Sequence, residues 1–302
     1  MSFSVIALVQ TLLNGALLGC LFGTIALGMT IKWGYLGVAD FFHLSLTLLG
    51  AYATYTLVTE LRLDPFLSIA LTVPLFFLVG VGVQRVFHLL NADPFTMLLL
   101  TFALFIVVQS TVSLVWSPDL LSLRPYLPDS FTGSLRLPGP FKLVVAPVDL
   151  VALAWAVGLV GATAYTLRRT RWGRALKAMR QDPAIAETLG VRVLPVALVV
   201  SGLAAATAAL AGMVLALRMP LSPTLPLNWI GIVVVATLLG RLGNPLGALI
   251  AAAVLMMAQN AWSLWFPPQW APAVTYGILF ALLAAQPLAR VARERLTSRS
   301  PA

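Results

Sequence analysis

The sequence predicts an all-α fold, a polytopic transmembrane helical bundle, and three observations lead to this prediction. Apolar residues make up 60% of the 302 residues and charged residues only 10%. The mean hydropathy is +0.96. A soluble domain would carry about 25% charged residues, so this chain has too little polar surface to face water and is expected to face a bilayer. We expect one transmembrane domain over residues 1–302.

Nine apolar segments follow one another along the chain, most of them near the roughly 20 residues that cross about 30 Å of hydrocarbon. They are 5–31, 38–59, 66–89, 95–117, 147–167, 195–217, 221–240, 245–265 and 272–289. Segment 221–240 is the weakest because Pro223 and Pro226 interrupt its start. We expect a broken span there, since interrupted helices in transporters often lie beside the substrate path.

Basic residues set the expected orientation of the bundle. With the N-terminus outside and the C-terminus inside, 14 of the 19 lysines and arginines fall on the inner side. This arrangement places residues 168–194 and the basic tail 290–302 in the cytoplasm, and the loop 118–146 outside. That outer loop contains five prolines and is expected to form no helix. Alternation over residues 134–144 predicts a short hairpin, which either docks an external binding protein or packs on the bundle as a lid.

The longest polar run, residues 171–191, predicts two short helices. Four apolar residues recur at helical spacing in its first half: Trp172, Ala175, Leu176 and Met179. In its second half Asp182 is expected to cap a helix, with Pro183 at the first helical position and Gly190 beyond its end. A helix of two turns is marginal alone, so we expect a partner to hold residues 183–189. The alternative is a basic loop that only orients the protein.

This run resembles the cytoplasmic coupling segment of the branched-chain amino acid (Liv-type) ABC transporter permeases. The family's pattern of spaced threonine, alanine and glycine falls on Thr170, Gly173, Ala175, Ala178, Ala186 and Gly190. In ABC importers such a segment seats in a groove on the ATPase subunit. The resemblance implies that the ATPase-coupling residues of this chain are Gly173, Arg174, Asp182, Pro183, Glu187 and Gly190.

The first span resembles the opening of the same permeases, with Gln10, Asn14 and then several glycines. Gly15, Gly19 and Gly23 are four residues apart, a spacing that forms a smooth face for close helix contact. We expect this face to pack within the subunit and not in a dimer contact. Small residues also fill the span near 195–217, as in the family, and give the same packing role to Gly202 and Gly212.

Residues 38–52 resemble the family's Asn-Phe-Ala-His-Gly element followed by Gly-Ala-Tyr. Phe41 and His43 match that element, whereas Asp40 stands where asparagine is usual and Leu44 where glycine is usual. Asp40 and His43 would share one face of a helix. Ionisable residues at the margin of a span usually face the interior or a water-filled path. Asp40, Phe41 and His43 are therefore candidates for a translocation path or gate, the alternative being an interfacial pair that reaches water.

Two further elements carry candidate roles. Thr101 and Gln109 are eight residues apart in the fourth span and either line the path or bond a neighbouring helix. Residues 240–247 resemble the family's glycine-rich turn, with Arg241 in place of the second glycine. That turn is either a second contact with the ATPase or a plain tight turn.

Several function classes are excluded or disfavoured. The net charge of +9 is spread between spans and not clustered with stacking aromatics, which argues against nucleic acid. No phosphate-binding loop of the GxxxxGK[ST] kind occurs, so any ATPase must be another chain. One cysteine, Cys20, excludes internal disulfides and cysteine-rich metal sites. We expect no catalytic residue set, no metal site and no cofactor, and hence no enzyme.

The sequence and the resemblance together predict the permease subunit of an ABC importer, multi-pass in the bacterial inner membrane. Its expected partners are two ABC ATPase subunits, a second related permease in a heterodimer, an extracytoplasmic substrate-binding protein and membrane lipid. Relatives carry leucine, isoleucine and valine, and we expect branched-chain or other small amino acids here. The alternatives are urea, amides or aromatic acids within the same family, or an ion-coupled secondary transporter or channel working without ATPases.

Overall fold

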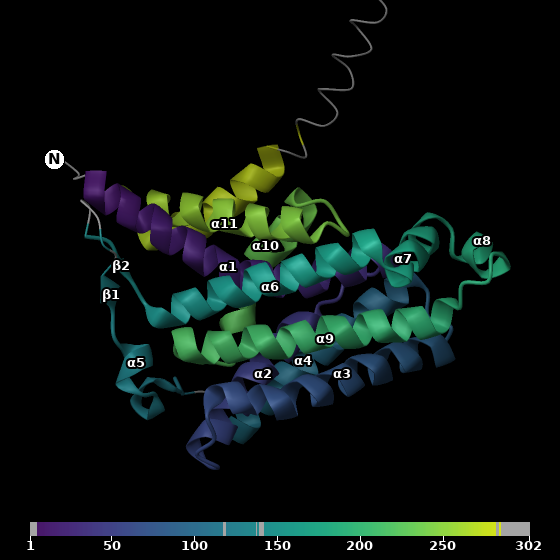
Figure 1. Cartoon of the computed structure of the whole chain (residues 1–302), viewed down its shortest axis with the longest axis horizontal. Helices are drawn as coiled ribbons and strands as arrows, with labels where there is room; N and C mark the ends of the chain where they lie inside the picture. The colour runs from purple at the N-terminus through teal and green to yellow at the C-terminus, as the bar shows by residue number, and fades with distance from the viewer. Residues whose placement is uncertain (1–4, 117–118, 137, 139–141, 282–283, 285–302) are drawn as a thin grey trace, which may run out of the picture.

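The computed structural model describes residues 5–116, 119–136, 138, 142–281 and 284, and these form the expected all-α bundle (Figure 1). The main helices, in chain order, are α1 (Val5–Leu36), α2 (Phe42–Thr59), α3 (Pro65–Leu89), α4 (Pro94–Trp116), α6 (Pro147–Arg169), α7 (Arg171–Gln181), α8 (Pro183–Thr188), α9 (Val193–Arg218), α10 (Leu225–Leu239) and α11 (Pro245–Trp262). The shorter elements are η1 (Arg124–Tyr126), α5 (Asp129–Thr132), β1 (Leu135–Arg136), β2 (Val144–Val145) and η2 (Pro268–Trp270). Residues 271–281 form one more helix.

Six of the described helices are long and apolar enough to cross a membrane: α1, α3, α4, α6, α9 and α11. This confirms the polytopic membrane class. The count of nine spans and the orientation stay predictions. Helix α10 has only 15 residues and starts after a non-helical stretch at 219–224, with Pro226 in its first turn. The later part of the predicted span 272–289 lies outside the described residues.

The region between the first two spans differs from the expectation. Helix α1 continues through Lys32 to Leu36, whereas the basic-residue count treated Lys32 as part of an inner loop. Helix α2 begins only at Phe42, so Asp40 precedes the helix instead of sharing a helical face with His43. Residues 32–36 have a low hydropathy, so the hydropathy pattern does not predict a helix there. Helix α1 continues through them because of tertiary contacts, which such a pattern does not describe.

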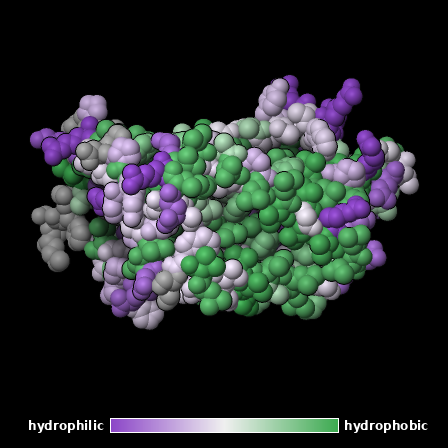
Figure 2. Space-filling model, turned by 90° about the horizontal axis from the view of Figure 1, so that it is seen from below, coloured by the Kyte–Doolittle hydropathy of each residue, from purple (hydrophilic) through white to green (hydrophobic). Residues whose placement is uncertain are grey.

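Helix α9 forms the centre of the bundle and packs against α1, α2, α3 and α6. Alanine and glycine dominate it, and buried residues lie all round its circumference, because small side chains let several helices approach one axis closely. The outer helices α3 and α4 expose large apolar side chains instead. Figure 2 shows the face on the side of α3, where these residues form a broad apolar band between two hydrophilic ends. Such a band suits a hydrocarbon environment.

The two ends of the bundle differ. Helices α7 and α8 lie at one end, and the N-terminal end of α1 lies at the opposite end with β1, β2 and α5 (Figure 1). We call these the coupling end and the hairpin end. The hairpin predicted over 134–144 is present as an antiparallel pairing of Leu135 with Val145 and Arg136 with Val144. The expectation of no helix in the loop was wrong, because η1 and α5 form single helical turns there, with Pro125 and Pro128 at or just before their starts.

Candidate functional site

Helix α7 packs onto the coupling end of the bundle through one face. The Thr170 hydroxyl caps it by accepting a hydrogen bond from the N–H of Gly173 at 3.2 Å. Leu176 and Met179 are buried in an apolar cluster with residues of α1, α6 and α9. Trp172 lies on the same helix at the predicted spacing but is 49% exposed, so the buried face of α7 does not extend to it. Arg174 faces solvent.

Helix α8 stands out from the bundle at the coupling end (Figure 1). The carboxylate of Asp182 accepts hydrogen bonds from the N–H groups of Ala184 and Ile185 at 2.9 and 3.0 Å. Pro183 occupies the first helical turn. Gly190 has a φ of +84°, the left-handed conformation in which glycine ends a helix without a steric cost. Both ends of this short helix are therefore fixed locally.

The side chains of α8 point away from the rest of the chain. Ala186 alone is buried on this helix, whereas Ile185 is 58% exposed and Leu189, which follows it, is 76% exposed. Glu187 is exposed too. Helix α8 and its C-terminal cap therefore present two large apolar side chains at the surface of the described chain.

A buried ion pair joins the end of α1 to the start of α2. The Lys32 Nζ lies 2.5 Å from Asp40 Oδ2, and each side chain is only 4% exposed. The same ammonium lies 5.8 Å from the centre of the Phe87 ring on α3. The second carboxylate oxygen, Asp40 Oδ1, is buried without a hydrogen-bond partner among the described residues.

His43 sits one helical turn away in a tight pocket. Its Nε2 atom lies 2.9 Å from the carbonyl oxygen of Ile25 on α1. A Cβ atom at Gly28 would overlap the imidazole ring, so glycine at that position leaves room for the histidine. Asp40 and His43 are 3% and 1% exposed. The alternative in which they reach water as an interfacial pair is therefore wrong for the described chain.

The remaining candidate path residues lie on or against α4. Phe41 contacts Phe102 edge to face, with ring centres 5.9 Å apart. Thr101 is fully buried and donates its hydroxyl hydrogen bond to the carbonyl of Leu98 in its own helix. Gln109 is half-buried. The structure therefore groups Asp40 and His43 around α1 and leaves Thr101 and Gln109 along a neighbouring helix.

The glycine face of α1 lies against α11. A Cβ atom at Gly15 would come within 2.8 Å of a backbone Cα atom, one at Gly19 would overlap another, and one at Gly23 would lie 3.2 Å from a third. The contacted residues, in order, are Met257, Ala253 and Leu249. We call this contact the α1–α11 ridge. Backbone thus meets backbone along three successive turns.

The two glycines of α9 occupy different contacts. A Cβ atom at Gly212 would lie 2.6 Å from the backbone N of Ala51, where α9 crosses α2. A Cβ atom at Gly202 would lie 2.7 Å from the ring of Phe77 on α3. The first contact is with backbone and the second with a side chain, so α9 is held more closely to α2 at Gly212 than to α3 at Gly202.

Sequence reasoning missed three polar contacts that hold the bundle together. Lys32 pairs with Asp40, as above. The side-chain amide of Gln10 forms two hydrogen bonds with the backbone of Val144 on β2, at 2.7 and 2.9 Å. Arg218 Nε lies 2.5 Å from Asp149 Oδ1 at the hairpin end. Each pair joins residues of different helices or loops, so no local spacing in the sequence predicts it.

Comparisons with known proteins point to one family. A family model described as "Branched-chain amino acid transport system / permease component" matches residues 11–283. The permease LivH of the high-affinity branched-chain amino acid transport system from Salmonella typhimurium is 25% identical, with 95% of this chain and 96% of the relative covered. LivH from Escherichia coli K12 gives the same values. BraD from Pseudomonas aeruginosa is 24% identical over 92% of this chain and 94% of its own. No solved structure matches.

Proposed function

Because this multi-pass membrane chain belongs to the family of branched-chain amino acid transport system permease components, we propose that it is the membrane-spanning subunit of an ABC importer. In this proposal it resides in the bacterial inner membrane and couples ATP hydrolysis by two partner ATPases to alternating access. Two permease chains are needed, because one α7–α8 segment per chain can engage only one of two ATPases. The family resemblance implies that the second chain is a related permease in a heterodimer. A substrate-binding protein delivers the solute from outside.

One observation carries the coupling proposal. Helix α8 is capped at both ends, yet Ile185 and Leu189 remain exposed beyond the bundle. Two apolar side chains on a short rigid helix suit insertion into a groove of a partner. The exposed Arg174 and Glu187 flank them and supply polar contacts at the rim. Gly173 lets α7 lie directly on the end of α6, since a Cβ atom there would lie 2.5 Å from the carbonyl oxygen of Thr166.

For the substrate we propose branched-chain or other small amino acids, on the basis of what the relatives' names say they transport. Asp40, Phe41, His43, Thr101 and Gln109 remain our candidates for a path or gate. The ion-coupled secondary transporter is less favoured. The two buried acids of the described spans and their margins, Asp40 and Asp149, are already paired with Lys32 and Arg218, and an ion-coupling carboxylate would need to be free to exchange its ion.

The test is copurification of the tagged chain with the products of its natural neighbours. The variant Ile185→Asp with Leu189→Asp should lose the ATPase subunits, because two charges cannot enter an apolar groove. The matched control is Leu120→Asp, which changes a 72% exposed leucine at the hairpin end and should retain them. Absence of any ATPase with the unaltered chain under mild extraction would contradict the importer proposal and favour the secondary transporter.

A further inference from the structure

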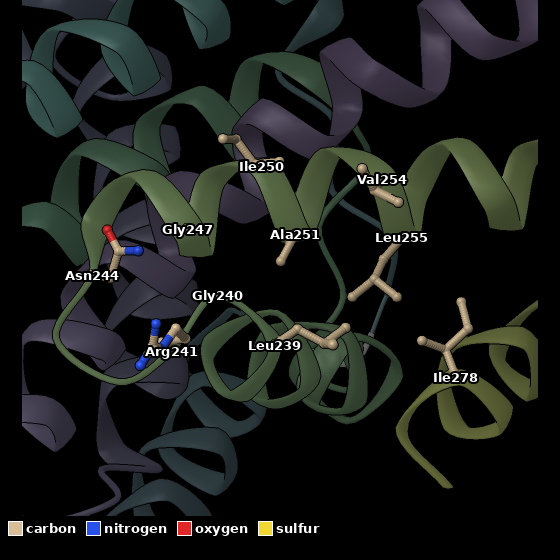
Figure 3. A pocket seen from close by; sticks show the side chains of 10 residues that line it. All are labelled: Leu239, Gly240, Arg241, Asn244, Gly247, Ile250, Ala251, Val254, Leu255 and Ile278. Atoms are coloured by element: carbon tan, nitrogen blue, oxygen red, sulfur yellow. The ribbon is translucent and has the colours of Figure 1, made fainter. Parts of the chain in front are cut away.

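A cavity with a volume of about 520 Å³ lies beside α11. Figure 3 shows its walls, which come from the end of α10, one side of α11 and the helix at 271–281. Five of its lining side chains are large and apolar: Leu239, Ile250, Val254, Leu255 and Ile278. The groove is deep because three of its lining residues are small: Gly240, Gly247 and Ala251. We call this cavity the α10–α11 groove.

The groove is amphipathic along its length. Arg241 and Asn244 lie near each other on the α10–α11 turn, whereas Leu255 and Ile278 lie at the far side of the view in Figure 3. The same turn is attached to the coupling end, since Tyr35 donates a hydrogen bond to the carbonyl of Gly243 at 3.1 Å. The polar end of the groove therefore belongs to the end of the bundle that carries α7 and α8.

Positive charge gathers at this polar end. No acidic residue lines the groove, and no ion-pair partner of the exposed Arg241 lies among the described residues. A neighbouring cavity shares Asn244 and is lined by Arg168 and Lys177. The polar end of the groove thus carries the exposed Arg241 beside the Asn244 amide, an arrangement that suits an anionic group attached to an apolar tail.

Arg241 also occupies an unfavourable backbone conformation. Its φ is +68°, in the left-handed region where a residue with a Cβ atom is less stable than glycine. Glycine would serve the turn better, so the turn itself does not require an arginine. The backbone of the turn therefore does not account for the arginine side chain at this position.

We propose that the α10–α11 groove binds an anionic phospholipid, with the headgroup phosphate on Arg241 and Asn244 and an acyl chain along Ile250, Val254 and Leu255. Arginine grips a phosphate with two parallel hydrogen bonds, and the Asn244 amide donates another. The apolar walls replace lipid contacts along the acyl chain. Under the predicted orientation this mouth faces the cytoplasmic side of the membrane.

The test uses the full chain, purified in mild detergent with whatever subunits accompany it, and native mass spectrometry with added phosphatidylglycerol or phosphatidylcholine. The unaltered protein should retain phosphatidylglycerol preferentially. Arg241→Gly should lose that preference by about tenfold, the effect of one charge-assisted phosphate contact, while its melting temperature stays equal or rises. Arg241→Lys should keep most of the preference. Ala251→Phe, which fills the groove, should reduce the binding of both lipids.

The matched control is Arg62→Gly. Arg62 also has a positive φ, 51°, but it lies between α2 and α3 and does not line the groove, so its replacement should leave lipid preference unchanged. Equal retention of phosphatidylglycerol by Arg241→Gly and the unaltered chain would overturn the proposal. So would loss of a copurifying second permease from Ala251→Phe with lipid binding intact, since the groove would then be a subunit interface. Neither result bears on the ATPase contact of α8.

Discussion

Lys32 and Asp40 form an ion pair with an Nζ–Oδ2 distance of 2.5 Å in a region where both side chains are almost fully excluded from solvent. Removing one partner leaves an uncompensated charge in a medium of low dielectric constant. Asp40→Leu is therefore expected to lower the free energy of unfolding by about 3–5 kcal/mol. The measurement is thermal or denaturant unfolding of the purified chain in detergent.

The double variant Lys32→Met with Asp40→Leu is the informative companion. Two apolar side chains in place of a buried pair are often neutral or stabilising, so the double variant should recover most of the loss. If the single and double variants are equally unstable, loss of the ion pair is not the cause of the instability. If the double variant folds, its transport activity separates a structural role of the pair from the proposed role of Asp40 in gating.

The α1–α11 ridge gives a second prediction. Gly19→Ala should destabilise the protein by about 1–3 kcal/mol, because the new methyl group overlaps the backbone of Ala253 and the helices must move apart. Gly158→Ala on α6 is the control, since no atom lies within 4 Å of the added Cβ. That change should be neutral or slightly stabilising in a helix. Similar melting temperatures for the two variants would contradict the close contact.

The cap of α8 gives a third prediction. Asp182→Ala removes the acceptor of two backbone hydrogen bonds and should destabilise the helix by about 1 kcal/mol. Hydrogen exchange of residues 184–189 should then accelerate severalfold, and ATPase copurification should weaken. Asp182→Asn keeps an acceptor and should behave nearly as the unaltered chain does. Unchanged exchange in Asp182→Ala would show that partner contacts, and not the cap, order this helix.

The hairpin end gives a fourth prediction. Gln10→Leu abolishes both hydrogen bonds to Val144 and should expose the β1–β2 hairpin to limited proteolysis. Gln109→Leu is the control, because Gln109 lies on α4 and forms no hydrogen bond with the hairpin among the described residues. If the outer loop docks a binding protein, Gln10→Leu should also weaken that docking. Protease resistance equal to that of the unaltered chain would show that other contacts hold the hairpin.

The turn before α4 gives a pH-dependent prediction. Hydrogen bonds from the hydroxyl and backbone N–H of Thr96 lower the pKa of Asp93. A lowered pKa in the folded state stabilises the helix start above the ordinary value of about 3.9, and that contribution disappears as the pH falls through the lowered pKa. Hydrogen exchange at residues 95–98 should increase only in strong acid. In Thr96→Val the same increase should begin at higher pH.

Much of the architecture followed from composition and local signals. Apolar run length gave the helices of the bundle, and Asp182, Pro183 and Gly190 bracketed α8 because caps act through backbone groups a few residues away. The spacing of Gly15, Gly19 and Gly23 predicted a contact face, although it could not identify α11 as the neighbour. All of these features depend on residues close together in the sequence, so the sequence alone predicts them.

The features that the sequence did not predict depend on residues that are not neighbours along the chain or on the limits of a buried face. Lys32 was predicted to lie in a loop because it is charged. Its ion-pair partner Asp40 lies beyond the end of α1, and a hydropathy pattern does not predict that the two residues meet. Trp172 has helical spacing with Leu176, yet spacing alone does not say where the buried face of α7 ends. The contacts of Gln10 and Arg218 span 134 and 69 residues, and only the folded chain brings such groups together.

The α1–α11 ridge has a mechanical consequence. Helices whose backbones touch over three turns cannot slide past one another without first separating, so α1 and α11 should travel as one rigid body during transport. Displacement must then be absorbed at flexible joints. Gly37 is one suitable hinge, because its φ is +74° and no atom beyond its chain neighbours lies within 4 Å of the position that a Cβ atom would take there. The non-helical stretch at 219–224, before α10, is the other. In the proposed alternating access, α1 and α11 would thus keep their mutual arrangement while the neighbouring helices change theirs.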